Sequence, residues 1–490
     1  MTWLPACLAA ALLVLLLAVF LRTLRFGAPA GPLPRAADDA EIAAGAAERL
    51  AGALRFPTLS HLDPGPAEID PFERMQADLA DAFPAVHTVL QLERVGSLGL
   101  LFTWPGREPE LKPVLLMAHQ DVVPVSEATL EEWTHPPFGG TIAGGFIWGR
   151  GALDDKASLI GLLEATEGLL KEGFRPRRTV YLACGHDEET GGENGSARIA
   201  ELLRRRGVRL AWVLDEGGMV TEGLIPGVTA PVALVGIAEK GFVTLELTAN
   251  GEGGHSSLPR RPTTIGILSR ALDRLENRPF PADLTLSRPF FAALGPALPF
   301  SRRLLLANLW LFGPLVKRAL ARSPELNALI RTTVAPTMLA AGIQENVLPD
   351  RASAIVNLRI LPGASVAGTL ERIEATIADA RVTVRAREVC GEPLPMPAVD
   401  DPGYRLIEKT IRQTAKQPEL RVAPFLETGA TDSRHYRGLA DAIYRFAFLR
   451  LGAGDLQRLH GVDERISTAN YLELIRFYTL LLKNLEKDED

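Results

Sequence analysis

Short apolar runs alternate with longer helical patterns through the first half of the chain. The runs PVLLMAH, RTVYLACG and LAWVLDEGG are typical of strands that are buried on both faces of a sheet. Residues 42–54 have helical spacing, and so does LIGLLEATEGLLKEG, which ends near Gly173. Strands that alternate with helices predict an α/β domain with a mainly parallel sheet flanked by helices. Functional side chains of such sheets gather at the carboxyl ends of the strands.

The pattern changes near Ile237. The segments GFVTLELTANGEGG and ASAIVNLRILPG alternate apolar and polar residues, as half-exposed strands do, and GTLERIEATIADA and VTVRAREV then read as helix and strand. We expect residues 237–390 to form an inserted α+β domain with antiparallel strands. The α/β domain then has two parts, residues 41–236 and residues 391–490. The second part ends in an amphipathic helix. A chain of 490 residues needs more than one core.

The N-terminus carries a long uncharged segment, residues 4–21, followed by Arg22 and Arg25. A membrane span needs about 20 apolar residues, so we interpret residues 1–26 as a membrane anchor and the Gly/Pro/Ala-rich residues 27–40 as a linker. The alternative is a signal-like segment cleaved near Ala-Pro-Ala at 28–30, which would give a secreted form. No Lys or Arg precedes the run, and this favours the anchor. The arginines favour a cytoplasmic body, but one short segment leaves the side of the membrane open.

A second apolar segment, residues 279–323, contains PFFAALGPALPF and LLLANLWLFGPLV. We favour a helical elaboration packed on the inserted domain. The alternative is an exposed apolar surface for an acyl chain or a membrane.

Composition narrows the partners. The 53 basic and 59 acidic residues give a net charge of −6 without a basic stripe, so we expect no nucleic-acid partner. Three cysteines are too few for a disulfide framework.

Candidate metal ligands follow the predicted strands. His119 and Asp121 are two residues apart in MAHQDVVPV, so they face the same side of a strand. An imidazole that binds metal usually donates its other ring N–H to a carboxylate, which suits Asp121. A lone histidine here would be read as a core residue. The acidic motifs that accompany His119 favour a ligand.

Two acidic doublets follow in GRGALDDK and GHDEETGG. The carboxylate of Asp154 can bridge two cations, with Asp155 as its competitor, or the pair can simply cap the next helix. Of Glu188 and Glu189, one can bind metal while the other takes a proton from water. The alternative for this pair is a solvated acidic turn.

A third doublet, Asp215-Glu216, ends the run LAWVLDEGG. Consecutive strand residues point in opposite directions, so we expect one of the two to bind metal. His460, in RLHGVDER, would complete a second ion site or is a surface-loop histidine. Together these residues predict a two-metal hydrolytic centre.

The runs AHQDVVP, GRGALDDK and DEETGG, in this order, resemble the hallmark motifs of the zinc-dependent aminoacylase and carboxypeptidase exopeptidases. GEGGHSSLP, QENVLPD and VNLRILPG extend the resemblance, which covers roughly residues 45–485. Within that family the chain is most similar to the carboxypeptidase S and N-fatty-acyl-amino-acid synthase/hydrolase group. The usual glycine after the motif lysine is Ala157 here.

The resemblance implies two zinc ions per chain, with cobalt or manganese as alternatives. It makes Glu188 the general base and Asp121 the residue that orients a ligand. His255 would stabilise the oxyanion from the inserted domain, and Asn346 and Arg359 would hold the substrate carboxylate. It also implies a homodimer through the inserted domain. The implied metal ligands are His119, Asp154, Glu189, His460 and one member of the pair Asp215 and Glu216.

The expected function is a membrane-anchored dizinc hydrolase. It would cleave the amide bond of N-acyl amino acids, including N-fatty-acyl ones, or the C-terminal residue of short peptides. One alternative is a plain dipeptidase or short-chain deacylase. Another is a catalytically silent, membrane-tethered scaffold on the same fold. A serine nucleophile at Ser256 or Ser257 is disfavoured because no G-x-S-x-G motif is present.

Overall fold

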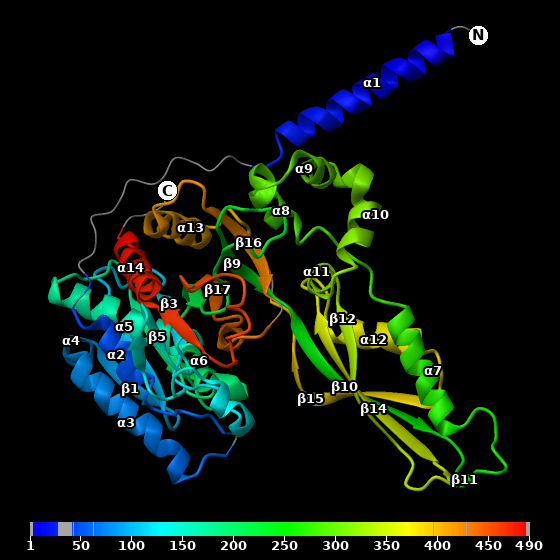
Figure 1. The fold of residues 1–490 in the computed structure, drawn as a ribbon, viewed down its shortest axis with the longest axis horizontal. Coiled ribbons are helices and arrows are strands. Elements are labelled where there is room, and N and C mark those ends of the chain that lie inside the picture. Colours follow the sequence, from blue (N-terminus) through cyan, green and yellow to red (C-terminus); the bar gives the residue numbers. More distant parts are fainter. Residues whose placement is uncertain are drawn as a thin grey trace.

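The computed structural model describes residues 3–27, 42, 44–61, 63–394, 396–427 and 429–486. It contains a large α/β domain, a smaller domain beside it, and a helix that projects away from both (Figure 1). The predicted linker at residues 27–40 lies outside the described residues except for Gly27.

The large domain is built on a ten-stranded mixed sheet. The three apolar runs form its centre, where β3 (Val114–His119) pairs in parallel with both β6 (Val180–Gly185) and β7 (Leu210–Asp215). The carboxyl ends of these strands therefore meet at one edge, as predicted. The other strands of this sheet are β1 (Gln91–Val95), β2 (Gly99–Trp104), β8 (Val220–Thr221), β9 (Val232–Glu239), β16 (Arg421–Glu427), β17 (Ala440–Arg445) and β18 (Arg450–Leu451).

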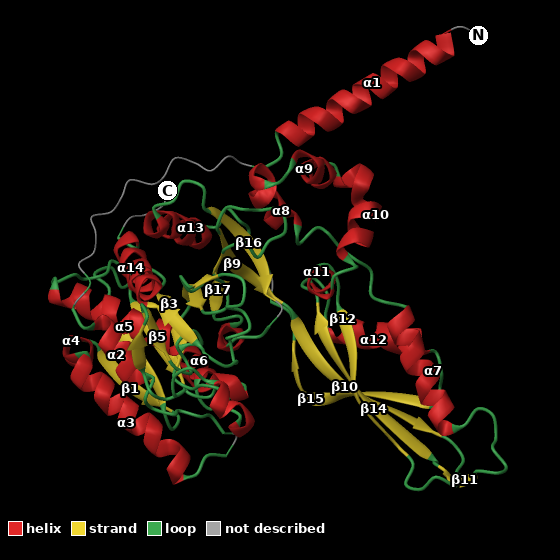
Figure 2. Ribbon diagram, in the orientation of Figure 1, coloured by secondary structure: helices red, strands yellow, loops and turns green. Residues whose placement is uncertain are grey.

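Helices cover both faces of this sheet, because its central strands carry apolar side chains on both sides (Figure 2). In β3, Leu116 belongs to the core under α5 (Lys156–Lys171) and α14 (Thr468–Asn484), whereas Leu115 belongs to the core under α6 (Ser196–Arg205). The domain also contains α2 (Ala46–Ala53), α3 (Pro66–Ala82), α4 (Pro84–Val89), α13 (Pro402–Ala415), the 3₁₀ helices η1 (Glu127–Glu132), η2 (Glu188–Thr190) and η4 (Asp432–Tyr436), and a small sheet of β4 (Thr141–Ala143), β5 (Phe146–Trp148) and β19 (Arg465–Ser467).

The smaller domain is a four-stranded antiparallel sheet in the order β12-β14-β10-β15. The alternation in β10 buries Val243, Leu245 and Leu247 in a core that also includes residues of two helices. The predicted boundary at Ile237 falls inside β9 of the large sheet, so this second sheet begins at Gly241. Its elements are β10 (Gly241–Asn250), β12 (Thr333–Ala341), β14 (Arg351–Ile360), β15 (Val382–Gly391), α7 (Thr264–Asn277) and α12 (Val366–Ile377), with β11 (Gly254–His255) and β13 (Val347–Leu348) pairing at one end.

The apolar segment 279–323 is helical, as expected. Phe290 of α8 (Arg288–Leu294) contacts Phe425 of β16, with ring centroids 6.2 Å apart, so α8 packs on the large sheet. Phe291 of the same helix shares a core with Ile330, which lies between residues 237 and 390. The segment continues through η3 (Gly295–Ala297), α9 (Phe300–Ala307) and α10 (Leu309–Leu320) to α11 (Pro324–Ala328).

The projecting helix, α1 (Trp3–Leu24), is long and apolar enough to cross a membrane by length and composition. Its base lies beside α8 and α9 (Figure 1). Its side chains are exposed except those of Val19 and Thr23, which lie near its C-terminal end.

Candidate metal centre

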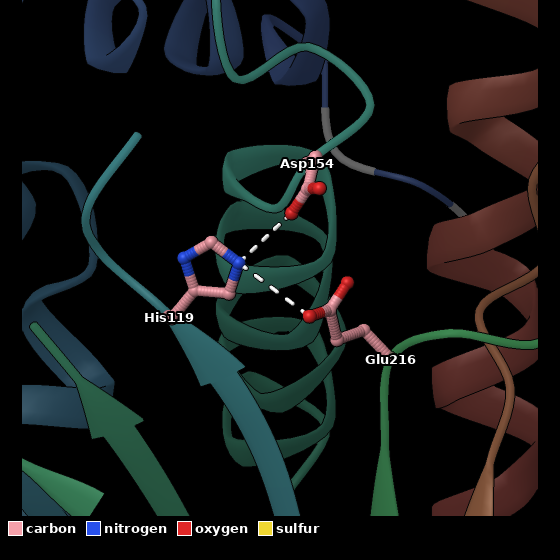
Figure 3. A group of neighbouring side chains, drawn as sticks. All are labelled: His119, Asp154 and Glu216. Atoms are coloured by element: carbon pink, nitrogen blue, oxygen red, sulfur yellow. Dashed lines mark hydrogen bonds and ion pairs between the residues drawn. The ribbon is translucent and has the colours of Figure 1, made fainter. Parts of the chain in front are cut away.

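His119, the last residue of β3, lies at the centre of a carboxylate cluster (Figure 3). Its Nε2 is 2.9 Å from Oδ1 of Asp154, which comes from the loop after β5, and 3.6 Å from Oε1 of Glu216, which follows β7. These three side chains can hold one metal ion between them. The cluster forms where the predicted strands end.

A second group shares Asp154. Nε2 of His460 is 3.0 Å from Oδ2 of Asp154 and 3.3 Å from Oε1 of Glu189. The two oxygens of Asp154 therefore face two different histidines. A carboxylate that faces two ligand groups in this way has the geometry of a bridge between two cations.

Glu188 lies beside both groups, and with His119 and Glu189 it forms a third set of close oxygen and nitrogen atoms. Asp121 fixes this loop, because its two oxygens accept the backbone N–H groups of Glu188 and Glu189 at 3.2 and 3.0 Å. Oδ1 of Asp121 is also 3.2 Å from Nδ1 of His119. Asp121 thus positions both the histidine and the glutamate pair.

The structure distinguishes the members of two acidic doublets. Asp215 is buried, and its Oδ2 accepts the backbone N–H of Ser433 at 2.9 Å, whereas Glu216 faces His119. Similarly, Oδ2 of Asp155 accepts the backbone N–H of His119, while the neighbouring Asp154 faces the imidazole. Asp155 occupies the N-cap position of α5 but makes no side-chain capping bond, so simple helix capping does not explain this doublet.

Burial and close packing perturb the charges of this cluster. Burial and the nearby Asp154 raise the pKa of Glu216 well above its ordinary value. Burial would also raise the pKa of Asp154, but hydrogen bonds with His119 and His460 outweigh it and hold that pKa below its ordinary value. Hydrogen bonds with Asp154 and Glu189 raise the pKa of His460 to about 10. In the metal-free protein, protons on Glu216 and His460 therefore offset part of the negative charge of the cluster. Bound cations would displace these protons.

The three candidate residues of the inserted domain are not brought to this centre. His255 lies in β11, which is far from the centre in Figure 1, and its Nδ1 is 2.7 Å from Oγ of Ser257. The backbone oxygen of Asn346 accepts the N–H of Ser256, so Asn346 is close to His255. Arg359 lies on β14 over the ring of Phe242, 5.9 Å from its centroid.

Sequence reasoning missed one residue that shapes the centre. Glu464 is fully buried, and its Oε1 accepts the backbone N–H groups of Gly151, Leu153 and Asp154 at 3.1, 2.8 and 3.2 Å. Its Oε2 pairs with Arg150 at 2.5 Å. Glu464 thus holds the glycine loop that presents Asp154. The available signal was the arginine of GRG, because an arginine in a buried glycine turn needs an acidic partner.

The fold and the cluster together define a metal-dependent hydrolase of the peptidase class, with a carboxylate- and imidazole-lined centre on an α/β domain and a second domain inserted in the chain. The chain belongs to the peptidase family M20/M25/M40, whose family model matches residues 115–484.

Named relatives agree with this assignment. The chain is 40% identical to a probable carboxypeptidase S-like 2 of Dictyostelium discoideum, over 90% of this chain and 85% of that protein. It is 40% identical to the N-fatty-acyl-amino acid synthase/hydrolase PM20D1 of Homo sapiens, over 90% of this chain and 88% of that protein. The fold resembles the M20 family metallo-carboxypeptidase Sso-CP2 from Sulfolobus solfataricus, with a TM-score of 0.63, 20% identity, and coverage of 90% of this chain and 99% of that one.

Proposed function

We propose that this hydrolase binds two zinc ions and cleaves the amide bond of N-acyl amino acids, with long fatty-acyl groups preferred. The observation that carries the proposal is the position of Asp154 between two histidines, with a separate acid completing each side. The named relatives supply the substrate class, because their names include N-fatty-acyl-amino acid synthase/hydrolase.

The donor set fits two ions. His119, Asp154 and Glu216 would hold the first ion, and Asp154, Glu189 and His460 the second. Imidazole nitrogen with carboxylate oxygen suits zinc, and it also accepts cobalt or manganese. Two bound zinc ions would supply Lewis-acid polarisation of the scissile carbonyl and lower the pKa of a nearby water.

Glu188 would do the proton transfer. It is not needed to complete either ion site, and the N–H contact to Asp121 holds its backbone beside the cluster. Its carboxylate would take the proton from the attacking water and deliver it to the leaving nitrogen of the amide. The products would be a free carboxylic acid and a free amino acid.

The inserted domain would complete the site. His255 would donate to the oxyanion, and Asn346 and Arg359 would hold the substrate carboxylate. Because His255 lies far from the candidate metal centre of its own chain, this role requires either closure of the two domains or a second copy of the chain. We favour a homodimer, in which a partner supplies this residue.

The exposed edge of the inserted sheet supports a dimer. β12 lies at one end of the strand order, and its Met338 and Leu339 are 65% and 64% exposed. An edge strand with exposed apolar side chains can pair with the same strand of a second copy about a twofold axis.

Helix α1 would anchor the protein in a membrane. It has 22 residues, which at about 1.5 Å per residue is long enough to span a hydrocarbon core of about 30 Å. Either side of the membrane is compatible with this proposal, and so is a secreted form released by cleavage.

A substrate panel tests the proposal. The full chain in detergent, loaded with zinc, would be given N-oleoyl-phenylalanine, N-acetyl-phenylalanine and the dipeptide Gly-Phe, with and without a chelator. We expect chelator-sensitive phenylalanine release, fastest from the oleoyl compound. Preference for either short substrate would instead make the enzyme a deacylase or dipeptidase. No release from any of the three would contradict the proposed substrate class.

A further inference from the structure

The end of α1 is tied to the apolar helices that lie beside it. Asn308, between α9 and α10, is fully buried, and its Nδ2 donates to the backbone oxygen of Val19 at 3.3 Å and to Oγ1 of Thr23 at 3.2 Å. Arg303 of α9 donates to the backbone oxygen of Leu24 at 2.6 Å. These polar bonds in an apolar contact fix the direction in which α1 leaves the body.

Apolar packing strengthens the same joint. The rings of Phe20 in α1 and Phe300 in α9 have centroids 6.1 Å apart. Phe26, just after α1, packs against the core formed by Leu284, Phe291 and Val316. The last turn of α1 and the two helices α9 and α10 therefore form one packed unit.

Several large apolar side chains of this unit are exposed to solvent. Phe300 is 50% exposed, and on α10 Trp310, Leu311 and Leu315 are 55%, 42% and 55% exposed. Leu311 and Leu315 are four residues apart, so they lie on one face of α10. Tryptophan is enriched where protein meets the membrane–water interface.

The charge of the unit differs from that of the whole chain. The protein carries −6, yet the longer segments that contain this unit, residues 3–27 and 288–323, contain no Asp or Glu and together hold eight Arg or Lys residues. Arg318 continues the exposed face of Leu311 and Leu315 toward the end of α10. Basic side chains that border an apolar face are complementary to the anionic head groups of a bilayer.

We propose that α9 and α10 form a second membrane-contact surface, which lies in the head-group region of an anionic bilayer beside the point where α1 enters it. The inference rests on the proposed anchoring by α1 for the position of the bilayer, and it goes beyond anchoring because it assigns a face of the body to the lipid. The contact would hold the large domain at a fixed height and tilt above the membrane.

A depth measurement on the full chain tests this surface. The background carries Cys7→Ser and Cys390→Ser, which removes the two exposed cysteines. In it, one of the substitutions Trp310→Cys, Leu315→Cys, Leu13→Cys or Ile343→Cys would carry an environment-sensitive fluorophore. Position 13 reports on α1 itself. Ile343, which is 96% exposed at the far end of the inserted domain, is the matched control. The protein would be reconstituted in vesicles of phosphatidylcholine and phosphatidylglycerol in a ratio of roughly 3:1, with a doxyl-labelled lipid as quencher.

We expect the quencher to remove roughly half of the fluorescence at 310 and 315 and less than about a tenth at 343. Replacing phosphatidylglycerol by phosphatidylcholine should weaken quenching at 310 but not at 13. Quenching at 310 no stronger than at 343, with position 13 quenched, would overturn the surface and leave the anchor standing. Quenching at 310 without quenching at 13 would show that α10 contacts lipid, but it would overturn the placement of this surface beside a membrane-spanning α1. Equal quenching at 310 in the two lipid mixtures would overturn the part assigned to charge.

Discussion

Asp154 and His460 are 306 residues apart in sequence, yet Oδ2 of the aspartate lies 3.0 Å from Nε2 of the histidine. The contact joins the loop after β5 to the loop before β19. The small sheet explains the proximity, because β19 pairs with β5 and so brings the two loops to the same place.

Glu188→Gln should keep both metal ions and lose turnover by about 10²–10⁴-fold, because the amide cannot accept the proton of the attacking water. Metal content by mass spectrometry and kcat with an N-acyl amino acid measure the two effects separately. Glu193→Gln, an exposed change in the same loop, is the control and should stay close to the parent. Activity within a few-fold of the parent for Glu188→Gln would remove Glu188 from the role of base.

Glu216→Ala should reduce bound zinc from two ions to one per chain, whereas Asp215→Asn should leave both ions in place. The reason is orientation, since Glu216 faces His119 and Asp215 accepts the N–H of Ser433. Equilibrium dialysis against buffered zinc gives the stoichiometry. The reverse result, with loss of an ion only in Asp215→Asn, would reject the assignment.

Zinc uptake should release protons and should weaken as the pH falls. In the metal-free protein the pKa of His460 is about 10, and hydrogen bonds with Asp121 and Asp154 outweigh burial to raise the pKa of His119 as well. Both imidazoles therefore hold protons near neutral pH, and zinc must displace them. Calorimetric titration in two buffers of different ionisation enthalpy should show at least about two protons released per chain. Uptake without proton release would contradict the raised pKa values.

Glu464→Gln should weaken metal binding by about 10–100-fold without touching a ligand, since it loosens the loop that presents Asp154. Competition with a zinc-binding dye measures the affinity. Asp463→Asn changes the neighbouring acid, whose side chain bonds Thr134 at an exposed site, and serves as the control. Equal affinities for the Glu464→Gln variant and the parent would limit Glu464 to a role in folding.

Mixing two inactive variants should restore activity if a partner supplies His255. In a randomised mixture of Glu188→Gln and His255→Ala chains, about one quarter of the sites would combine an intact Glu188 with an intact His255 from the other chain. The recovered rate, followed over time after mixing, is the measurement. No recovery, with subunit exchange verified by differently tagged chains, would mean that His255 acts within its own chain.

The strands and the edge that bears the centre could be predicted, because buried parallel strands leave continuous apolar runs and their carboxyl ends must meet. The sequence could not predict which member of each doublet, Asp154-Asp155 or Asp215-Glu216, faces the centre. Adjacent residues point in opposite directions, but the sequence does not say which direction faces the centre, because that depends on where each strand ends relative to β3. Glu464 was missed because it acts on a loop that lies more than 300 residues earlier in the sequence, and only the fold brings the two together.

The joint between α1 and α9 has a consequence for shedding. A protease that cuts anywhere between residues 28 and 43 separates α1 from the body covalently, but Asn308 and Arg303 still bind the last turn of α1. Such a cut alone would therefore leave a nicked, two-piece protein that stays attached to its helix. Release of the body from the membrane would therefore require two events, cleavage of the chain and dissociation of α1 from α9 and Asn308.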